Sequence, residues 1–121
     1  MPGRKLEARV RQHQPRIAII ELHGEINSAA EADLNAAYAE AAQDAPDVIL
    51  LNFGDVDYIN STGIALIVAL LGQARAAQRT LLACDLNEHY IEIFRITRLV
   101  DFMQIYPDEA SALSSQSVGN T

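Results

Sequence analysis

Two apolar runs, separated by a short polar segment, constrain the fold of this chain more than any other feature. The first run, residues 48–53, is short, largely aliphatic and preceded by Pro46, which is typical of a strand buried on both faces. The second run, residues 64–71, continues through an alanine-rich stretch to Gln78, and only a helix of this composition reaches that length. The sequence therefore predicts a strand, a polar loop and a helix in that order.

The polar segment ends in four residues that can act chemically or turn the chain: Asn60, Ser61, Thr62 and Gly63. Hydroxyl groups at a helix start lie beside unpaired backbone N–H groups and the positive end of the helix dipole, where a phosphate group is electrostatically favoured. Two roles of Ser61 are compatible with this position. It could cap the helix, which contributes about 1 kcal/mol, and it could be a phosphorylation switch.

The rest of the chain alternates strands with helices after an initial hairpin. Strands are expected at four further places, residues 6–11, 16–22, 80–85 and 102–106, and the first two form an antiparallel hairpin that Gly24 closes. Helices are expected from Ser28, which forms a capping box with Glu31, at residues 90–97 and from Pro107. The first of these helices has an apolar face made of Ala30, Leu34, Ala37, Tyr38 and Ala41.

This order predicts an α/β fold: a single domain, residues 1–121, with a mixed β-sheet, an N-terminal antiparallel hairpin and about four helices. An ordered core is expected at about residues 6–113, with loose ends at residues 1–5 and 114–121.

Composition excludes several classes of function. Half of the 121 residues are hydrophobic, which is enough for one domain with its own core. No apolar run approaches about 18 residues and no apolar stretch follows the basic start, so we expect no membrane insertion and a cytoplasmic protein. The net charge of −7 disfavours direct binding of nucleic acid.

Signals for catalysis or metal binding are weak. The single cysteine, Cys84, is expected to be a buried apolar residue and allows neither an internal disulfide nor a cysteine-based zinc site. Asp55 and Asp57 could form the acidic pair of a receiver pocket, but the only lysine is Lys5, so we assign them to loop solvation. No partner at metal-ligand spacing accompanies any of the histidines, His13, His23 and His89. The sequence predicts no enzyme activity, no metal and no cofactor.

The helix after the polar segment is apolar almost all round, which favours burial on more than one side. One stripe of it consists of small residues at helical spacing: Ala65, Ala69, Gly72 and Ala76. A face of this kind lets another backbone approach closely. Two interpretations remain open, since either a neighbouring helix of the same domain or a partner protein could cover the stripe.

The segment Asp-x-Asp-Tyr-Ile-Asn-Ser-Thr-Gly-Ile, residues 55–64, lies between a buried strand and an apolar helix and resembles the STAS domain. This module is shared by sulfate transporters and bacterial anti-sigma factor antagonists. The turn Gly-Glu-Ile-Asn, residues 24–27, is similar to the family's Gly-Glu-(Leu/Ile)-Asp, and residues 94–105 are similar to its Phe-x-Ile-Thr-x-Leu region. The resemblance spans roughly residues 6–113 and favours a helix at residues 90–97, where periodicity alone also allows a strand.

The resemblance implies a function. In the antagonists, a serine of this segment is phosphorylated by a partner kinase that is itself the anti-sigma factor. That serine corresponds to Ser61, with Thr62 as the neighbouring hydroxyl, and a PP2C-type phosphatase would remove the phosphate. The partner, rather than this chain, would hold ATP, and a homodimer is a further assembly to test. The implied partner-binding residues are Asn27, Asn60, Ser61, Thr62, Gly63, Ala65 and Ala69.

Two residues depart from the family pattern, because Asn27 and Asn60 stand where the antagonists usually carry aspartate. An amide repels an incoming phosphate less than a carboxylate does. Replacing a carboxylate by an amide also removes acceptor oxygens that could orient the serine hydroxyl or pair with a partner's arginine. The sign of the net effect on phosphorylation therefore stays open. The asparagines favour, modestly, an alternative: a STAS adaptor subunit of an ABC lipid transporter or of a larger signalling assembly, without control by phosphorylation.

Overall fold

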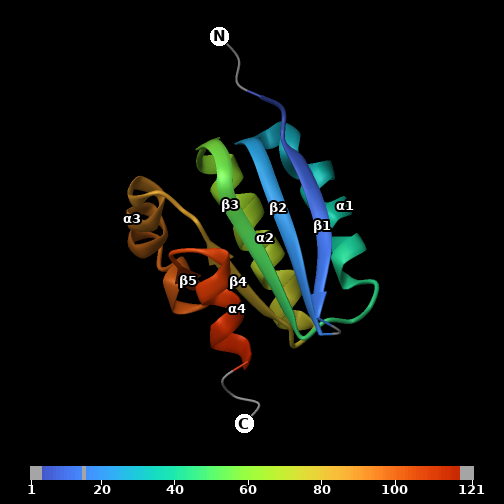
Figure 1. The fold of residues 1–121 in the computed structure, drawn as a ribbon. Coiled ribbons are helices and arrows are strands. Elements are labelled where there is room, and N and C mark those ends of the chain that lie inside the picture. The colour runs from blue at the N-terminus through green and yellow to red at the C-terminus, as the bar shows by residue number, and fades with distance from the viewer. Residues whose placement is uncertain (1–3, 15, 118–121) are drawn as a thin grey trace.

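A computed structural model describes residues 4–14 and 16–117 of the chain and contains one five-stranded sheet (Figure 1). Its strands follow the order of the sequence: β1 (Glu7–Gln14), β2 (Ile17–Ile26), β3 (Val48–Ile59), β4 (Thr80–Cys84) and β5 (Gln104–Tyr106). β1 and β2 pair antiparallel, and the other neighbours pair parallel. The predicted α/β class, mixed sheet and N-terminal hairpin are therefore confirmed.

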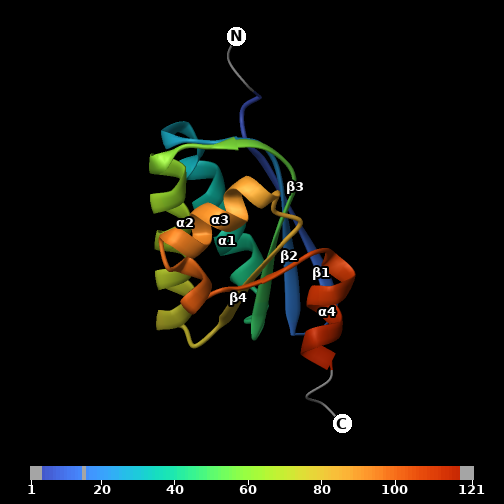
Figure 2. The ribbon, with the colours of Figure 1, turned by 90° about the vertical axis from the view of Figure 1, so that its left-hand side faces the viewer.

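Helices cover both faces of this sheet. They are α1 (Glu31–Ala42), α2 (Ser61–Ala76), α3 (Glu88–Ile96) and α4 (Glu109–Ser117), with short 3₁₀ turns η1 (Ser28–Ala30) and η2 (Leu99–Asp101). α1, α2 and α3 lie on one face and α4 lies on the other (Figure 2). The expected number of helices is confirmed for the described residues, and the segment that periodicity left ambiguous is the helix α3.

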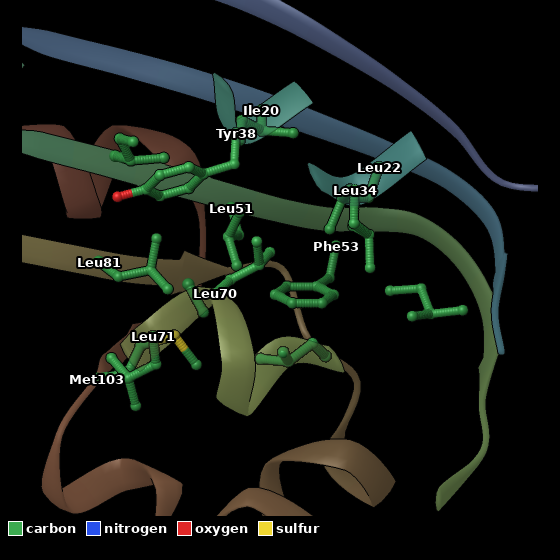
Figure 3. Close-up of a cluster of buried hydrophobic side chains, with 14 of the residues drawn as sticks. Ile20, Leu22, Leu34, Tyr38, Leu51, Phe53, Leu70, Leu71, Leu81 and Met103 are labelled. Carbon is green, nitrogen blue, oxygen red and sulfur yellow. The ribbon is translucent and has the colours of Figure 1, made fainter. Parts of the chain in front are cut away.

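The first half of the central strand, residues 48–53, is buried on both faces apart from the half-buried Asn52, as its apolar run predicts. Because side chains alternate along a strand, Ile49 and Leu51 join the large core under α1 and α2, while Val48 and Leu50 join the smaller core under α4. Figure 3 shows the large core, where side chains of the sheet meet those of α1 and α2. The apolar face predicted for α1 is buried in this core: Ala30, Leu34, Ala37, Tyr38 and Ala41.

Two strands run further than predicted. β2 continues past Leu22 to Ile26, so Gly24 does not end the hairpin but lies inside the strand with φ +105°. A Cβ atom at Gly24 would lie 2.6 Å from the carbonyl oxygen of Lys5, so the chain before β1 can pass only because this residue is glycine. β3 continues to Ile59 and stays paired with β2 through two shifts of register, which places Asp55 and Asp57 in a strand rather than in a loop.

The cap of the first helical segment also differs from the prediction. Asn27, not Ser28, is the capping residue, and its side-chain oxygen accepts a hydrogen bond from the backbone N–H of Ala29 (2.9 Å). Ser28 is already the first residue of η1, so the predicted capping box with Glu31 does not form. The first helical segment is thus capped one residue earlier than the pattern of Ser28 and Glu31 predicts.

Both ends of the described chain have contacts or regular structure that the sequence did not predict. Arg4 is fixed by ion pairs to β3, and its carbonyl oxygen accepts a hydrogen bond from the backbone N–H of Glu25 (3.0 Å). α4 continues through Ser117, so the first residues of the predicted loose tail are helical. Residues 1–3 and 118–121, the remainder of the predicted loose ends, lie outside the described residues.

Candidate functional site

The start of α2 is capped by Asn60. Its side-chain oxygen accepts a hydrogen bond from the backbone N–H of Gly63 (2.8 Å), and its carbonyl oxygen accepts one from the backbone N–H of Ile64 (2.9 Å). The backbone N–H of Asn60 in turn donates to the carbonyl oxygen of Ile26 (3.2 Å), which ties the cap to the end of β2. The expectation that Ser61 is the N-cap is therefore wrong, because that role belongs to the preceding amide.

Ser61 and Thr62 occupy the first turn of α2, and both are exposed. No acidic residue lies in this turn. The helix dipole makes the first turn electropositive, and no neighbouring carboxylate in the turn offsets it. A phosphoryl group on the Ser61 hydroxyl would thus lie in solvent at a position that favours negative charge.

A second capping asparagine lies next to this turn. Ile26 of β2 pairs with Ile59 of β3, so Asn27 and Asn60 follow directly at the same ends of two neighbouring parallel strands. Both asparagines are half-buried, and the side-chain amide of Asn27 donates to the carboxylate of Glu25 (3.3 Å). Two capping asparagines that lie far apart in the sequence are thus neighbours at one end of the sheet.

Gly63 has a structural role. It is buried, and a Cβ atom there would lie 2.1 Å from the carbonyl oxygen of Ile26. This approach lets the first turn of α2 pack directly on the end of β2. Contact between Gly63 and a partner, as the sequence suggests, does not fit this burial.

The stripe of small residues on α2 is open. All four of its members, Ala65, Ala69, Gly72 and Ala76, are exposed, as is Val68 beside them. Of the two interpretations of the stripe, the one in which a neighbouring helix of the same domain fills it is therefore wrong for residues 4–14 and 16–117. The prediction that α2 is buried on more than one side fails for this side, while its opposite side packs on the sheet through Ile67, Leu70 and Ala74.

Asp55 and Asp57 bind the guanidinium group of Arg4, a contact that sequence analysis missed. Arg4 Nε and Nη2 donate to the two carboxylate oxygens of Asp57 (2.9 and 3.1 Å), and Nη1 donates to Asp55 Oδ2 (3.1 Å). His23 Nδ1 lies 2.9 Å from the same oxygen of Asp55. Hydrogen bonds from Arg4 and then from His23 lower the pKa of Asp55 to about 2.

The pairing raises the pKa of Arg4 through its hydrogen bonds to Asp57 and Asp55, so the group stays charged at any ordinary pH. The two aspartates are two positions apart and alternate with Val56, a pattern that is typical of a strand and indicates that β3 continues past Phe53. The partner Arg4 gave no signal, because 53 residues separate it from Asp57.

Three further observations concern Cys84, possible metal ligands and the length of the helices. Cys84 is buried, and burial followed by the charges of Asp85 and Glu109 raises the pKa of its thiol to about 12, which disfavours the reactive thiolate. Within the described part of the chain, no group of three or more histidine, cysteine or acidic side chains could hold a metal ion. No helix of that part has both the length and the apolar character that crossing a membrane requires.

Two surface grooves have sizeable volumes. One, of about 450 Å³, lies between β1 and α1, and the other, of about 590 Å³, lies between α3 and β5. Neither groove is lined by Ser61 or by any other residue predicted for the site. Of the predicted site residues, Ser61 and Thr62 are instead exposed in the first turn of α2.

Comparison with known proteins defines the class. The family model of the STAS domain matches residues 8–112, so this chain belongs to the STAS domain family. A relative from Bordetella bronchiseptica, named as the candidate anti-sigma factor antagonist BtrV, is 33% identical over 86 residues, which cover 71% of this chain and 72% of BtrV.

Solved structures share the fold. An anti-sigma factor antagonist from Mycobacterium paratuberculosis superposes with a TM-score of 0.75 at 18% identity, covering 92% of this chain and 93% of the other. The anti-sigma factor antagonist SpoIIAA in its unphosphorylated form gives 0.72 at 16% identity, with 93% and 99% covered. The phosphorylated form of SpoIIAA, a Bacillus cell fate determinant, gives 0.69 at 19% identity, with 90% and 98% covered.

Proposed function

We propose that this STAS protein is an anti-sigma factor antagonist that binds an anti-sigma factor with serine kinase activity, and that phosphorylation of Ser61 releases this partner. One observation carries the proposal: the Ser61 hydroxyl is exposed in the first turn of α2, while Asn60 performs the capping. The hydroxyl can therefore be modified without loss of the helix cap. Thr62, which is also exposed, is the second candidate acceptor.

The switch follows from local electrostatics. A phosphoryl group adds nearly two negative charges and three acceptor oxygens, and the helix N-terminus accommodates them without rearranging the fold. On the partner's side, a surface that fits an uncharged serine has to accept a desolvated dianion. Repulsion, crowding and desolvation then cost several kcal/mol, enough to abolish a complex of micromolar affinity.

The comparisons support the proposal by analogy. BtrV carries the name of a candidate anti-sigma factor antagonist and is related over most of both chains. SpoIIAA, which has the same fold, has been solved in an unphosphorylated and in a phosphorylated form. We infer that the present chain works in the same class of regulation, in the cytoplasm and without enzymatic activity of its own.

In this scheme the anti-sigma kinase supplies ATP and a PP2C-type phosphatase resets the antagonist. Asn27 and Asn60 take part as neutral caps at the adjacent ends of β2 and β3. Because both are amides, this chain presents no capping carboxylate to an approaching γ-phosphate, which lowers repulsion during transfer.

The test combines binding with phosphosite mapping. The purified protein is mixed with candidate anti-sigma kinases and ATP, and the product is digested and mapped by mass spectrometry. We expect phosphate on Ser61, binding of the kinase by the wild type, and at least tenfold weaker binding by Ser61→Glu. A matched variant, Ser28→Glu, adds the same charge at an exposed residue of η1 and is expected to keep a larger share of the affinity.

Failure would take a recognisable form. If no kinase labels Ser61 or Thr62, the phosphorylation switch is wrong. If the protein instead co-purifies with a transporter ATPase and Ser61→Glu leaves that association unchanged, the adaptor function that the two asparagines favour takes its place.

A further inference from the structure

The first strand of the sheet has one open edge. β1 pairs with β2 alone, so it ends the sheet on that side of the described chain (Figure 1). In an antiparallel strand, every second residue directs its backbone N–H and C=O groups away from the neighbouring strand. β1 therefore presents a row of backbone donors and acceptors along this edge, which is the surface that a further strand recognises.

A groove of about 450 Å³ lies between β1 and α1. None of the residues that line it belongs to β2, which places the groove on the outer side of β1, and its walls include Ala8, Ala36 and Ala37. Ala8 and Val10 are only half-buried, so α1 covers the apolar side of β1 incompletely. A strand added along the edge would cover the apolar surface of Ala8 and Val10 that remains open.

Two opposite charges on β1 lack partners. Glu7 and Arg9 are exposed, and neither forms an ion pair with any described residue. Arg9 lies opposite Glu21 in the pairing with β2, but the carboxylate of Glu21 binds Arg11. In contrast, Arg4 and Arg11 each bind two carboxylates. Because Glu7 and Arg9 are two positions apart, the open edge carries one unpaired negative and one unpaired positive charge on the same face.

This arrangement is complementary to itself. When two copies of β1 pair antiparallel about a two-fold axis at Ala8, Glu7 of each copy lies opposite Arg9 of the other. On the opposite face Ala8 meets its own copy, and Val10 meets Leu6. An axis at either charged neighbour would place Glu7 opposite Glu7 or Arg9 opposite Arg9, so the charges select the axis at Ala8.

The next cross-strand pair is also compatible with this register. Lys5, which forms no ion pair with any residue that the structure describes, would lie opposite Arg11 of the other copy. Arg11 binds the carboxylates of Glu21 and Glu109, so this group combines one positive with two negative charges. Its net negative charge attracts Lys5.

We infer that β1 is the interface of a homodimer, in which two copies pair antiparallel through residues 6–10 and join their sheets into one. Backbone hydrogen bonds hold the two strands together, and the two ion pairs between Glu7 and Arg9 fix their register. The occupant of the edge is a second copy, because both partners of each ion pair come from this strand. The inference does not depend on the proposed function, since Ser61 and Thr62 lie in α2.

Charge reversal tests the interface in the full chain. The mass in solution is measured by analytical ultracentrifugation from micromolar to submillimolar concentration, where we expect the wild type to reach twice the mass of one chain. Glu7→Arg and Arg9→Glu each place like charges opposite one another and should weaken the dimer about tenfold or more. The matched control Arg75→Glu makes the same change of charge at an exposed residue of α2 and should dimerise like the wild type.

Two rescue experiments make this test specific. The double variant that combines Glu7→Arg with Arg9→Glu exchanges the two charges and should dimerise again. An equimolar mixture of the two single variants should form a heterodimer, because the charges that face each other across the interface are then opposite in sign. Recovery in the mixture also shows that each single variant is folded.

A cross-link tests the position of the axis. Residues opposite each other in an antiparallel pair have Cα atoms about 4.5–5.5 Å apart, which is within the range of a disulfide. Ala8→Cys should therefore form a disulfide between two copies on mild oxidation. Val10→Cys should not, since two copies of residue 10 would be roughly 14 Å apart along the strands. The native Cys84 is buried and does not compete.

The outcomes decide the inference either way. Recovery of the dimer in the mixture, together with the cross-link at position 8, would support it. A wild type that stays monomeric at every concentration would overturn it, including the case in which β1 instead captures a strand of another protein. A dimer that tolerates both Glu7→Arg and Arg9→Glu uses a different surface, and this result would overturn the inference as well.

Discussion

The side-chain oxygen of Asn60 accepts a hydrogen bond of 2.8 Å from the backbone N–H of Gly63, and this bond leaves the neighbouring hydroxyl of Ser61 outside the helix cap. The residue that stabilises the start of α2 and the residue that can carry a phosphate are thus adjacent but distinct. A capping serine would lose its bond to the helix on modification. In this protein the helix cap and the phosphorylation site can be altered one at a time by substitution, so each can be tested separately.

Replacement of Asn60 separates helix stability from phosphorylation. Asn60→Ala removes the cap and should lower the free energy of unfolding by about 1 kcal/mol in urea denaturation. Asn60→Asp keeps an acceptor oxygen and places a negative charge at the helix N-terminus, so its stability should stay within about 0.5 kcal/mol of the wild type. Its phosphorylation rate should change more than its stability. An unchanged rate with the purified kinase would contradict a role for this side chain in transfer.

Replacement of Ser61 by alanine should leave the fold intact. The hydroxyl is exposed and does not cap α2, so the free energy of unfolding should change by less than about 0.5 kcal/mol. The same variant should take up no phosphate if Ser61 is the acceptor, whereas Thr62→Ala should still be labelled there. Urea denaturation and intact-protein mass spectrometry measure the two effects. A stability loss near 1 kcal/mol would instead indicate that Ser61 does cap the helix.

Local periodicity accounts for most of the fold that could be predicted from sequence. The apolar run at residues 48–53 and the alternation in residues 6–10 depend only on which faces are buried, so they identify β3 and β1 without knowledge of the partners. The position of Ser61 at the start of a helix follows from the same patterns. Its exposure, on which the proposed switch depends, needed the structure.

The missed features depend on contacts between distant residues. β3 extends past Phe53 because it stays paired with β2 and because Arg4 binds Asp55 and Asp57 across the sheet. No local pattern encodes a contact over 53 residues. The open side of α2 was misjudged for a different reason. An apolar residue such as Val68 looks the same in a sequence whether it faces its own core or a partner.

Gly63 and Gly72 provide a matched pair for testing how α2 is packed. Gly63→Ala would place a Cβ atom 2.1 Å from the carbonyl oxygen of Ile26, a backbone atom that cannot turn away, so we expect a loss of about 1–3 kcal/mol or more. Gly72→Ala has open space around the new atom and should stabilise the helix by about 0.5–1 kcal/mol. Urea denaturation of both variants measures the difference. Equal stabilities would contradict the close packing of α2 on β2.

Acid stability should depend on the contact between Arg4 and Asp55. Folding lowers the pKa of this carboxyl from 3.8 to about 2, because Arg4 and then His23 donate hydrogen bonds to it. Its contribution to stability is therefore complete above pH 3.8 and is lost as the pH falls through about 2. In Arg4→Gln the pKa of Asp55, measured by ¹³C NMR titration of the carboxyl carbon, should rise towards 3.8. Arg16→Gln, which removes the partner of Asp47 instead, should leave the pKa of Asp55 unchanged. An Asp55 pKa that stays near 2 in Arg4→Gln would show that His23 alone holds the carboxylate in its charged form.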